Sequence, residues 1–352
     1  MNTVFETLFK NKQRRIFFLT FLSMFVMVAL HNAGFRIGPV MSPLPQQEDM
    51  LFNILPKLQL HSNNFTVKRP QRIIPQAHAA SAADEASAYG VIDFATGDVL
   101  LEKNLDKRVS IASLTKIMTA VVVLDLAHPS EKFAVTKSAA RQIPTKIGVV
   151  PGEKFSVEEL LNAALLTSAN DAVEVIKDGI DAKYEKGLFI KAMNEKARII
   201  GLTNTSFENP QGFDGVNHYS TVEDLTLLTH YALTNYPLIA EIAEKDYEFL
   251  PETLDHKQYD LYNWNGLIGV YPGASGVKIG NTDDAGKTTV VTAKRDGHEI
   301  IAVVLGAPGI KERDMWAAEL LNEGFATGHG LERVEITEEQ LQEKYDSWQF
   351  WN

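Results

Sequence analysis

Ser113-Leu114-Thr115-Lys116 begins an apolar stretch that we expect to form a helix as far as Leu126. On a helix, residues three apart lie on one face with their Cβ atoms about 5–6 Å apart. Ser113 can therefore contact Lys116 without help from the rest of the fold. A serine hydroxyl is a weak nucleophile that needs a base within hydrogen-bond reach, and a neutral lysine amine can be that base. The pattern indicates nucleophilic chemistry at Ser113.

Two further short motifs strengthen this interpretation. Ser168-Ala169-Asn170 starts 55 residues after Ser113, near the end of a second expected helix. Lys278-Ile279-Gly280 starts 110 residues after Ser168, in a glycine-flanked strand. A Ser-x-x-Lys pattern alone more often marks a helix cap and a solvated lysine, but the order, spacing and context of all three motifs favour serine acyl transfer. Burial and a second cation, such as Lys278, would lower the pKa of Lys116 and keep its amine neutral.

Other stretches of the chain support a family resemblance. Ala88-Tyr89-Gly90-Val91-Ile92-Asp93 leads into Thr96-Gly97-Asp98-Val99-Leu100. Later stretches are Pro151-Gly152-Glu153, Asn209-Pro210-Gln211-Gly212, His218-Tyr219-Ser220-Thr221 and Tyr271-Pro272-Gly273. Together with the three motifs, about residues 86 to 327 resemble the low-molecular-mass D-alanyl-D-alanine carboxypeptidases, relatives of penicillin-binding proteins and serine β-lactamases.

The resemblance implies roles for the site residues. Ser113 would attack the carbonyl of the penultimate D-alanine of a peptidoglycan stem peptide, and Lys116 would be the general base. Ser168 and Lys278 would relay a proton to the leaving D-alanine, and Asn170 would hold the peptide amide. The backbone N–H groups of Ser113 and Asn281 would form the oxyanion hole, where each donor is worth about 3 kcal/mol. The implied substrate-binding residues are Asn170, Lys278, Ile279, Gly280 and Asn281.

One residue departs from the family pattern. The family usually has Thr or Ser between the lysine and the glycine of the third motif, whereas this chain has Ile279. The missing hydroxyl would help to bind the terminal carboxylate of the substrate, and a hydrogen bond to a charged group is worth about 1.5–3 kcal/mol. We therefore predict carboxypeptidase activity that is weakened by about 10- to 150-fold, rather than abolished.

Two alternatives to a carboxypeptidase stay open. The first is a non-catalytic, membrane-anchored wall-binding protein with the same fold, for which Ile279 is the only support. The second is a β-lactamase. Class A β-lactamases carry a glutamate that activates the deacylating water, but no Glu-x-x-Leu-Asn pattern occupies the loop after Ser168, and Glu319-Leu320-Leu321-Asn322 comes too late. The expected ligands are peptidoglycan pentapeptides and β-lactams.

Composition argues against several other classes of protein. The net charge is −11 and no basic stripe occurs outside the extreme N-terminus, so we expect no nucleic-acid partner. The absence of cysteine excludes disulfide and thiol chemistry. The nine histidines lack His-Glu-x-x-His spacing, so we expect no metal. The stretch 280–288 has five residues between its glycines where a phosphate-binding loop needs four, so we expect no nucleotide or other cofactor. We expect a structural role for His218.

The N-terminus predicts a membrane anchor. Residues 1–15 are basic near their end and would lie in the cytoplasm, while 16–35 are mainly apolar and just long enough to span a bilayer. The basic flank would place the rest of the chain outside the cell. A secreted protein, released by signal-peptide cleavage, is the alternative, although His31-Asn32-Ala33-Gly34 makes a poor cleavage site.

The remaining chain divides into a stem, a domain and a tail. Recurrent prolines and polar stretches predict a flexible stem over 36–85, followed by a catalytic domain at 86–330. The tail, 331–352, is aromatic near its end and would form either an amphipathic membrane contact or a helix packed on the domain. The oligomeric state stays open.

Within the domain, hydrophobic patterns predict strands at both ends with helices between. This order favours an α+β fold, an antiparallel β-sheet flanked by helices with a helical subdomain, as in β-lactamases and transpeptidases. The strands are expected at 88–94, 99–102, 276–278, 288–294 and 299–305, and the helices at 113–126, 156–168, 188–200, 220–233 and 314–325. Two of the helices should start at capping boxes, Ser156-Val157-Glu158-Glu159 and Ser220-Thr221-Val222-Glu223, and a turn at Arg295-Asp296-Gly297 should join the last two strands.

Overall fold

The computed structural model describes residues 54, 57–59, 61, 64–69 and 82–348. The chain divides into two compact units, Met1–Glu48 and Asp49–Asn352, and all the described residues lie in the second. The expected cytoplasmic segment 1–15 and the expected anchor 16–35 therefore lie outside the described residues. Among the helices that the structure describes, none is both long and apolar enough to cross a membrane.

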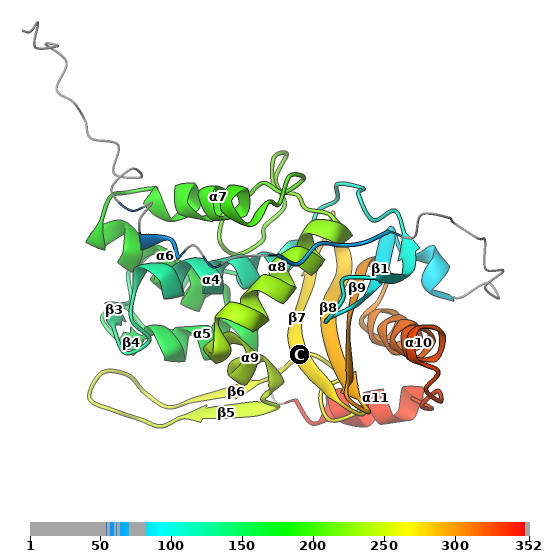
Figure 1. Cartoon of the computed structure of the whole chain (residues 1–352). Helices are drawn as coiled ribbons and strands as arrows, with labels where there is room; N and C mark the ends of the chain where they lie inside the picture. The colour runs from blue at the N-terminus through cyan, green and yellow to red at the C-terminus, as the bar shows by residue number, and fades with distance from the viewer. Residues whose placement is uncertain (1–53, 55–56, 60, 62–63, 70–81, 349–352) are drawn as a thin grey trace, which may run out of the picture. The chain divides into compact units, whose positions relative to one another are not determined.

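A five-stranded antiparallel sheet brings the two ends of the domain together (Figure 1). Gly90 on the first strand pairs with Val303 on the last, so the N-terminal hairpin continues the C-terminal strands. The spatial order is β2-β1-β9-β8-β7, which leaves β7 at one edge. The strands are β1 (Ala88–Asp93), β2 (Val99–Lys103), β7 (Ala274–Thr282), β8 (Gly286–Arg295) and β9 (His298–Ala307).

Helices cover the sheet and form a second, mainly helical region beside it (Figure 1). Two small two-stranded sheets lie outside the main sheet: β3 (Lys132–Ala134) pairs with β4 (Lys154–Ser156), and β5 (Tyr247–Leu250) pairs with β6 (Tyr259–Tyr262). The predicted α+β fold is confirmed. The helices are α4 (Lys116–Leu126), α5 (Val157–Leu165), α6 (Asn170–Lys183), α7 (Leu188–Ile200), α8 (Val222–Asn235), α9 (Pro237–Glu244), α10 (Ile310–His329) and α11 (Glu338–Asp346), with 3₁₀ turns η2 (Ala82–Glu85), η3 (Ala112–Thr115) and η4 (Ala139–Arg141).

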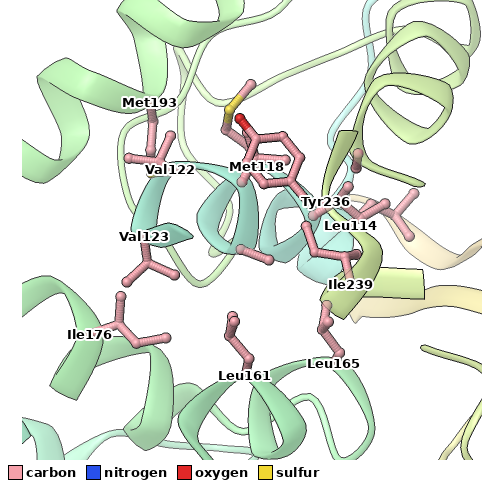
Figure 2. Close-up of a cluster of buried hydrophobic side chains, with 14 of the residues drawn as sticks. Leu114, Met118, Val122, Val123, Leu161, Leu165, Ile176, Met193, Tyr236 and Ile239 are labelled. Atoms are coloured by element: carbon pink, nitrogen blue, oxygen red, sulfur yellow. The ribbon is translucent and has the colours of Figure 1, made fainter. Parts of the chain in front are cut away.

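Helix α4 lies at the centre of the helical region (Figure 2). Its side chains are apolar nearly all round, a pattern typical of a helix buried on every side. Because Lys116 is the first residue of this helix, packing fixes the position of its backbone. The close-up shows side chains of the η3–α4 segment, including Met118, Val122 and Val123, among residues of the surrounding helices: Leu161, Leu165, Ile176, Met193 and Ile239.

Two helix starts test the predicted capping boxes. At α5, Ser156 Oγ accepts a hydrogen bond from the Glu159 N–H, and the Glu159 carboxylate accepts one from the Ser156 N–H, which confirms the first box. The second is wrong by one residue, because Thr221 caps α8 by accepting from the Asp224 N–H at 3.1 Å. Ser220 instead pairs its backbone with Val109.

Part of the expected stem packs against the domain, contrary to the prediction of a flexible segment over 36–85. We call the described residues between 54 and 69 the strap. Ile54 and Leu58 are no more than 1% exposed and belong to the hydrophobic core. The Gln59 carbonyl accepts hydrogen bonds from Lys196 Nζ at 2.7 Å and from the Tyr231 hydroxyl at 3.1 Å. Apolar burial and these polar contacts hold this part of the chain in place.

The strap continues from the helical region to the N-terminal hairpin. Phe65 stacks on the His230 ring with 3.7 Å between the ring centroids. Arg69 forms an ion pair of 2.8 Å with Glu223 at the start of α8. Thr66 lies so close to the β1–β2 turn that a Cβ on Gly97 would come within 2.1 Å of its carbonyl oxygen, so only glycine fits there.

The C-terminal tail packs on the domain as far as residue 348. Leu341 of α11 is fully buried and Trp348 is 5% exposed. The Tyr345 hydroxyl donates to the Asp314 carboxylate at 2.8 Å, and the Asn322 side chain pairs with the Val334 backbone. Of the two possibilities for this tail, the structure shows the packed helix.

Candidate active site

Ser113 and Lys116 meet at the start of α4. Lys116 Nζ lies 2.8 Å from Ser113 Oγ. Ser113 belongs to the 3₁₀ turn η3 and not to the expected α-helix, but the three-residue spacing still brings both side chains to one side. The sequence-based contact between these two residues is therefore present.

Polar contacts lock the turn that carries Ser113. The Thr115 hydroxyl donates to the Ala112 carbonyl at 2.9 Å, and His218 Nε2 lies 2.8 Å from the same hydroxyl. The Glu208 N–H donates to His218 Nδ1, so Nε2 carries the ring proton and donates it to Thr115. Burial lowers the pKa of His218 to about 4 and keeps the ring neutral. His218 thus supports the turn, as expected for a structural residue.

The Lys116 amine has two more partners. Its Nζ donates to Asn170 Oδ1 at 2.9 Å and to the Gln211 carbonyl at 2.8 Å. The side chain is fully buried, and this burial lowers the pKa of Lys116 to about 7, against the opposing effect of the Asp171 carboxylate. A substantial fraction of the amine is therefore neutral at physiological pH and can accept the Ser113 proton.

Ser168 and Asn170 reach the site from the link between α5 and α6. Helix α5 ends at Leu165, earlier than expected, and Asn170 opens α6, which sequence analysis did not predict. Ser168 has a positive φ of 60°, uncommon for a residue with a side chain. The Asn170 N–H donates to the Thr145 carbonyl at 2.8 Å and so fixes the neighbouring loop.

The Asp171 carboxylate, which the sequence did not single out, holds the same loop. Its oxygens accept from the N–H groups of Ile147, Gly148 and Val149 at 3.1, 2.8 and 3.1 Å. Because the carboxylate is fully buried at the start of α6, it ties the loop at 143–149 to the helix that carries Asn170. One wall of the site is fixed in this way.

Strand β7 forms the opposite wall. A Cβ on Gly280 would lie 2.9 Å from the Ser113 backbone nitrogen, so glycine lets the strand approach the turn closely. Lys278 is 1% exposed and its Nζ donates to the Ile279 carbonyl at 3.0 Å. Burial, with repulsion from Lys116 and Arg313, holds the pKa of Lys278 well below its ordinary value. For Lys116, the expected burial is the cause that lowers the pKa, and the expected second cation is not needed to explain it.

The two walls enclose a cavity of about 410 Å³. Predicted site residues from three separate parts of the chain line it together, while Lys116, Asn170 and Lys278 lie beneath or beside them. A carbonyl group placed in this cavity would face a serine nucleophile with its base already in contact. The lining residues are Ser113, Pro144, Thr145, Lys146, Ser168, Trp264, Ile279, Gly280, Asn281, Ile310 and Arg313.

Arg313 also lines the cavity, although the sequence did not predict it as a site residue. It lies in the first turn of α10, which begins four residues before the expected start at 314. The side chain is 1% exposed, and Nε and Nη2 donate to the two Asp314 carboxylate oxygens at 2.7 and 2.8 Å. No local motif marks it, because only the packing of α10 on the sheet brings it to the cavity.

Comparison with known proteins agrees with this geometry. Residues 75–309 match the family described as D-alanyl-D-alanine carboxypeptidase (Peptidase_S11). The D-alanyl-D-alanine carboxypeptidase DacF of Bacillus subtilis is 35% identical over 249 residues, which cover 69% of this chain and 63% of that protein. The chain therefore spans less than two thirds of the length of this relative.

Two solved structures are similar in fold as well as in sequence. The Streptomyces K15 DD-transpeptidase is 30% identical with a TM-score of 0.66, over 71% of this chain and 99% of that one. Penicillin-binding protein D2 from Listeria monocytogenes, in its ampicillin-bound form, is 32% identical with a TM-score of 0.61, over 71% of this chain and all of that one.

Proposed function

Because the chain belongs to the D-alanyl-D-alanine carboxypeptidase family, we propose that it is a serine-type D,D-peptidase of peptidoglycan stem peptides. The observation that carries the proposal is the 2.8 Å contact between Lys116 Nζ and Ser113 Oγ beside a cavity of suitable size. A nucleophile held by a buried amine with a lowered pKa is what acyl transfer to serine needs.

The proposed reaction proceeds through an ester on Ser113. The neutral Lys116 amine takes the hydroxyl proton while Ser113 Oγ attacks the carbonyl of the penultimate D-alanine. The backbone N–H groups of Ser113 and Asn281 stabilise the oxyanion. Collapse of the intermediate breaks the C–N bond, and the leaving D-alanine receives its proton by way of Ser168 and Lys278. Water then hydrolyses the ester and restores the serine.

We propose that Arg313 helps to bind the terminal carboxylate of the substrate. Ile279 lines the cavity where a threonine or serine would offer a hydroxyl, and its aliphatic side chain has no donor. Arg313 lines the same cavity, and its guanidinium, although paired with Asp314, carries a charge of the right sign. The carboxylate would then be held mainly by charge, with one donor fewer than in the usual motif.

Mass spectrometry of the protein after penicillin treatment tests the proposal. We expect one covalent adduct, located on Ser113, and no adduct in the Ser113→Ala variant. Release of D-alanine from a D-Ala-D-Ala peptide should follow the same pattern. A protein that forms no adduct would instead be the non-catalytic wall-binding protein, and sustained hydrolysis of nitrocefin would identify a β-lactamase.

We propose further that residues 16–35 are a retained membrane anchor, with the catalytic domain outside the cell. The support is the sequence alone: a basic flank followed by a mainly apolar segment of about bilayer length. Fractionation of cells, followed by N-terminal sequencing of the protein, tests this. An intact N-terminus in the membrane fraction agrees with an anchor, whereas a soluble protein that starts after residue 35 means cleavage and secretion.

A further inference from the structure

A buried pair of side chains lies behind the catalytic lysine. Gln211 is 3% exposed, and its backbone carbonyl accepts the hydrogen bond from Lys116 Nζ at 2.8 Å. Its side-chain Nε2 donates to Glu174 Oε2 at 2.6 Å. The same residue therefore contacts the lysine through its backbone and a carboxylate through its side chain.

Glu174 occupies a helix position that favours this arrangement. It lies four residues after Asn170 on α6, so both side chains lie on one face of the helix. Asn170 bonds Lys116 directly at 2.9 Å, whereas Glu174 reaches it through Gln211. Glu174 is 8% exposed, and its other oxygen pairs with Lys177 at 3.2 Å. Helix α6 thus contacts the amine by two routes.

We propose that Glu174 is a positioning residue, which acts through Gln211 to hold the carbonyl that binds the Lys116 amine. The inference rests on the proposed function, because it assigns Glu174 a part in the acylation of Ser113. A carbonyl fixed in this way keeps the amine turned toward Ser113 Oγ. If Gln211 loses its anchor, its backbone gains freedom and the lysine loses one of its three acceptors.

Loss of the contact between Glu174 and Gln211 should change the pKa of Lys116 in a predictable direction. A carbonyl acceptor favours the charged form of an amine. Displacement of the Gln211 carbonyl should therefore lower the pKa of Lys116. The other charged groups that face this amine are Asp171 from α6 and Lys278 from β7. The Glu174 carboxylate pairs with Lys177 and Gln211 and not with Asp171 or Lys278, so both of these groups would keep their effects when Glu174 is replaced.

The experiment measures the second-order rate of acylation of the full chain by a fluorescent penicillin between pH 5 and pH 9. For Glu174→Leu we expect the rate on the high-pH plateau of the pH profile to be about 10-fold lower. The fall in rate on the acid side of the profile, its acid limb, should be displaced to lower pH. Glu174→Gln keeps an oxygen that can accept from Gln211, so we expect a rate within about 2-fold of the parent and an unmoved limb.

Three further variants separate positioning from loss of stability. Gln211→Leu should reproduce Glu174→Leu, and the double variant should be no slower than either single one, because both remove the same contact. Asn162→Leu is the matched control. Asn162 is a buried amide on α5 that bonds the Glu158 carbonyl, so its loss should lower the melting temperature and leave the acid limb in place.

An unmoved acid limb in Glu174→Leu, or rate losses that multiply in the double variant, would overturn the inference. A parent protein that is not acylated at all would overturn the proposed function instead. A parent that reacts normally, with a Glu174→Leu variant indistinguishable from it, removes only the role of Glu174.

Discussion

The two walls of the active-site cavity are built differently. On the helical wall, side-chain hydrogen bonds fix the reacting groups: Lys116 has three acceptors within 2.9 Å, and Thr115 and His218 brace the turn that carries Ser113. On the strand wall, backbone pairing of β7 with β8 fixes the position, and Ile279 offers no polar group. Under the proposed function, the groups that would make and break bonds lie together on the helical wall, whereas the departure from the family pattern at Ile279 would affect recognition of the substrate carboxylate.

Replacing the base of the helical wall should have the largest effect. We expect Lys116→Met to reduce both penicillin acylation and D-alanine release by about 10²- to 10⁴-fold, the usual contribution of general acid–base catalysis. The measurement is acylation followed by gel fluorescence, beside D-alanine release. Lys294→Met, at an exposed position on β8, is the control and should react like the parent. A Lys116→Met protein with parental rates would show that another group accepts the Ser113 proton.

The pH dependence should come from the same wall. Burial lowers the pKa of Lys116 to about 7, so the amine is protonated below that pH and cannot act as a base. About half of the amine is neutral at pH 7 and about 1% at pH 5, so acylation should fall about 50-fold between these two pH values. Stopped-flow measurement of penicillin acylation checks this. A flat profile down to pH 5 would mean that the amine stays neutral throughout or takes no part in the proton transfer.

The strand wall should respond to a restored hydroxyl. We expect Ile279→Thr to raise D-alanine release about 10-fold, since one hydrogen bond to a charged group is worth at least about 1.5 kcal/mol. Ile279→Val has nearly the shape of the threonine without the hydroxyl and should give little change. Penicillin and its methyl ester sharpen the test, because only the free acid should react faster with the threonine variant.

If Ile279→Thr and Ile279→Val behave alike, or if the ester gains as much as the acid, the hydroxyl is not the missing feature. The difference between the two walls would then lie in the packing at β7 and not in polar contacts.

The smallest effect on activity should come from the strap, which contributes no residue to the lining of the cavity. Leu58→Ala removes a fully buried side chain and should lower the free energy of unfolding by about 2–5 kcal/mol. At a temperature where the protein stays folded, we expect the acylation rate and its pH profile to match the parent. Urea unfolding measures the stability change. An unchanged midpoint would mean that the strap does not belong to the cooperative fold.

The sequence was most informative where the chemistry is local. Ser113 and Lys116 are three residues apart and meet on one turn, so their contact could be predicted without a fold. The hairpin between β8 and β9 and the capping box at Ser156 also depend on neighbouring residues, and both were predicted. Asp296 and Gly297 have positive φ angles, in agreement with the expected turn.

Features that depend on tertiary contact were missed. Arg313 and Asp171 reach the site only because α10 and α6 pack where they do. Helix α6 itself was not expected, since its apolar positions are interrupted by charged residues that turn out to be buried and paired, among them Glu174. The strap was missed because polar residues predominate in it and prolines occur next to them in the sequence, a composition typical of a linker, while its few apolar side chains fill the core.

Under the proposed membrane anchoring, the strap would limit how far the catalytic domain can extend from the bilayer. If residues 16–35 are the anchor, 18 residues, 36–53, connect it to the buried Ile54. Even fully stretched, such a tether spans about 60 Å, whereas 50 residues would span about 175 Å. The short tether would keep the catalytic domain near the membrane. The domain would then act only on peptidoglycan that lies close to the membrane.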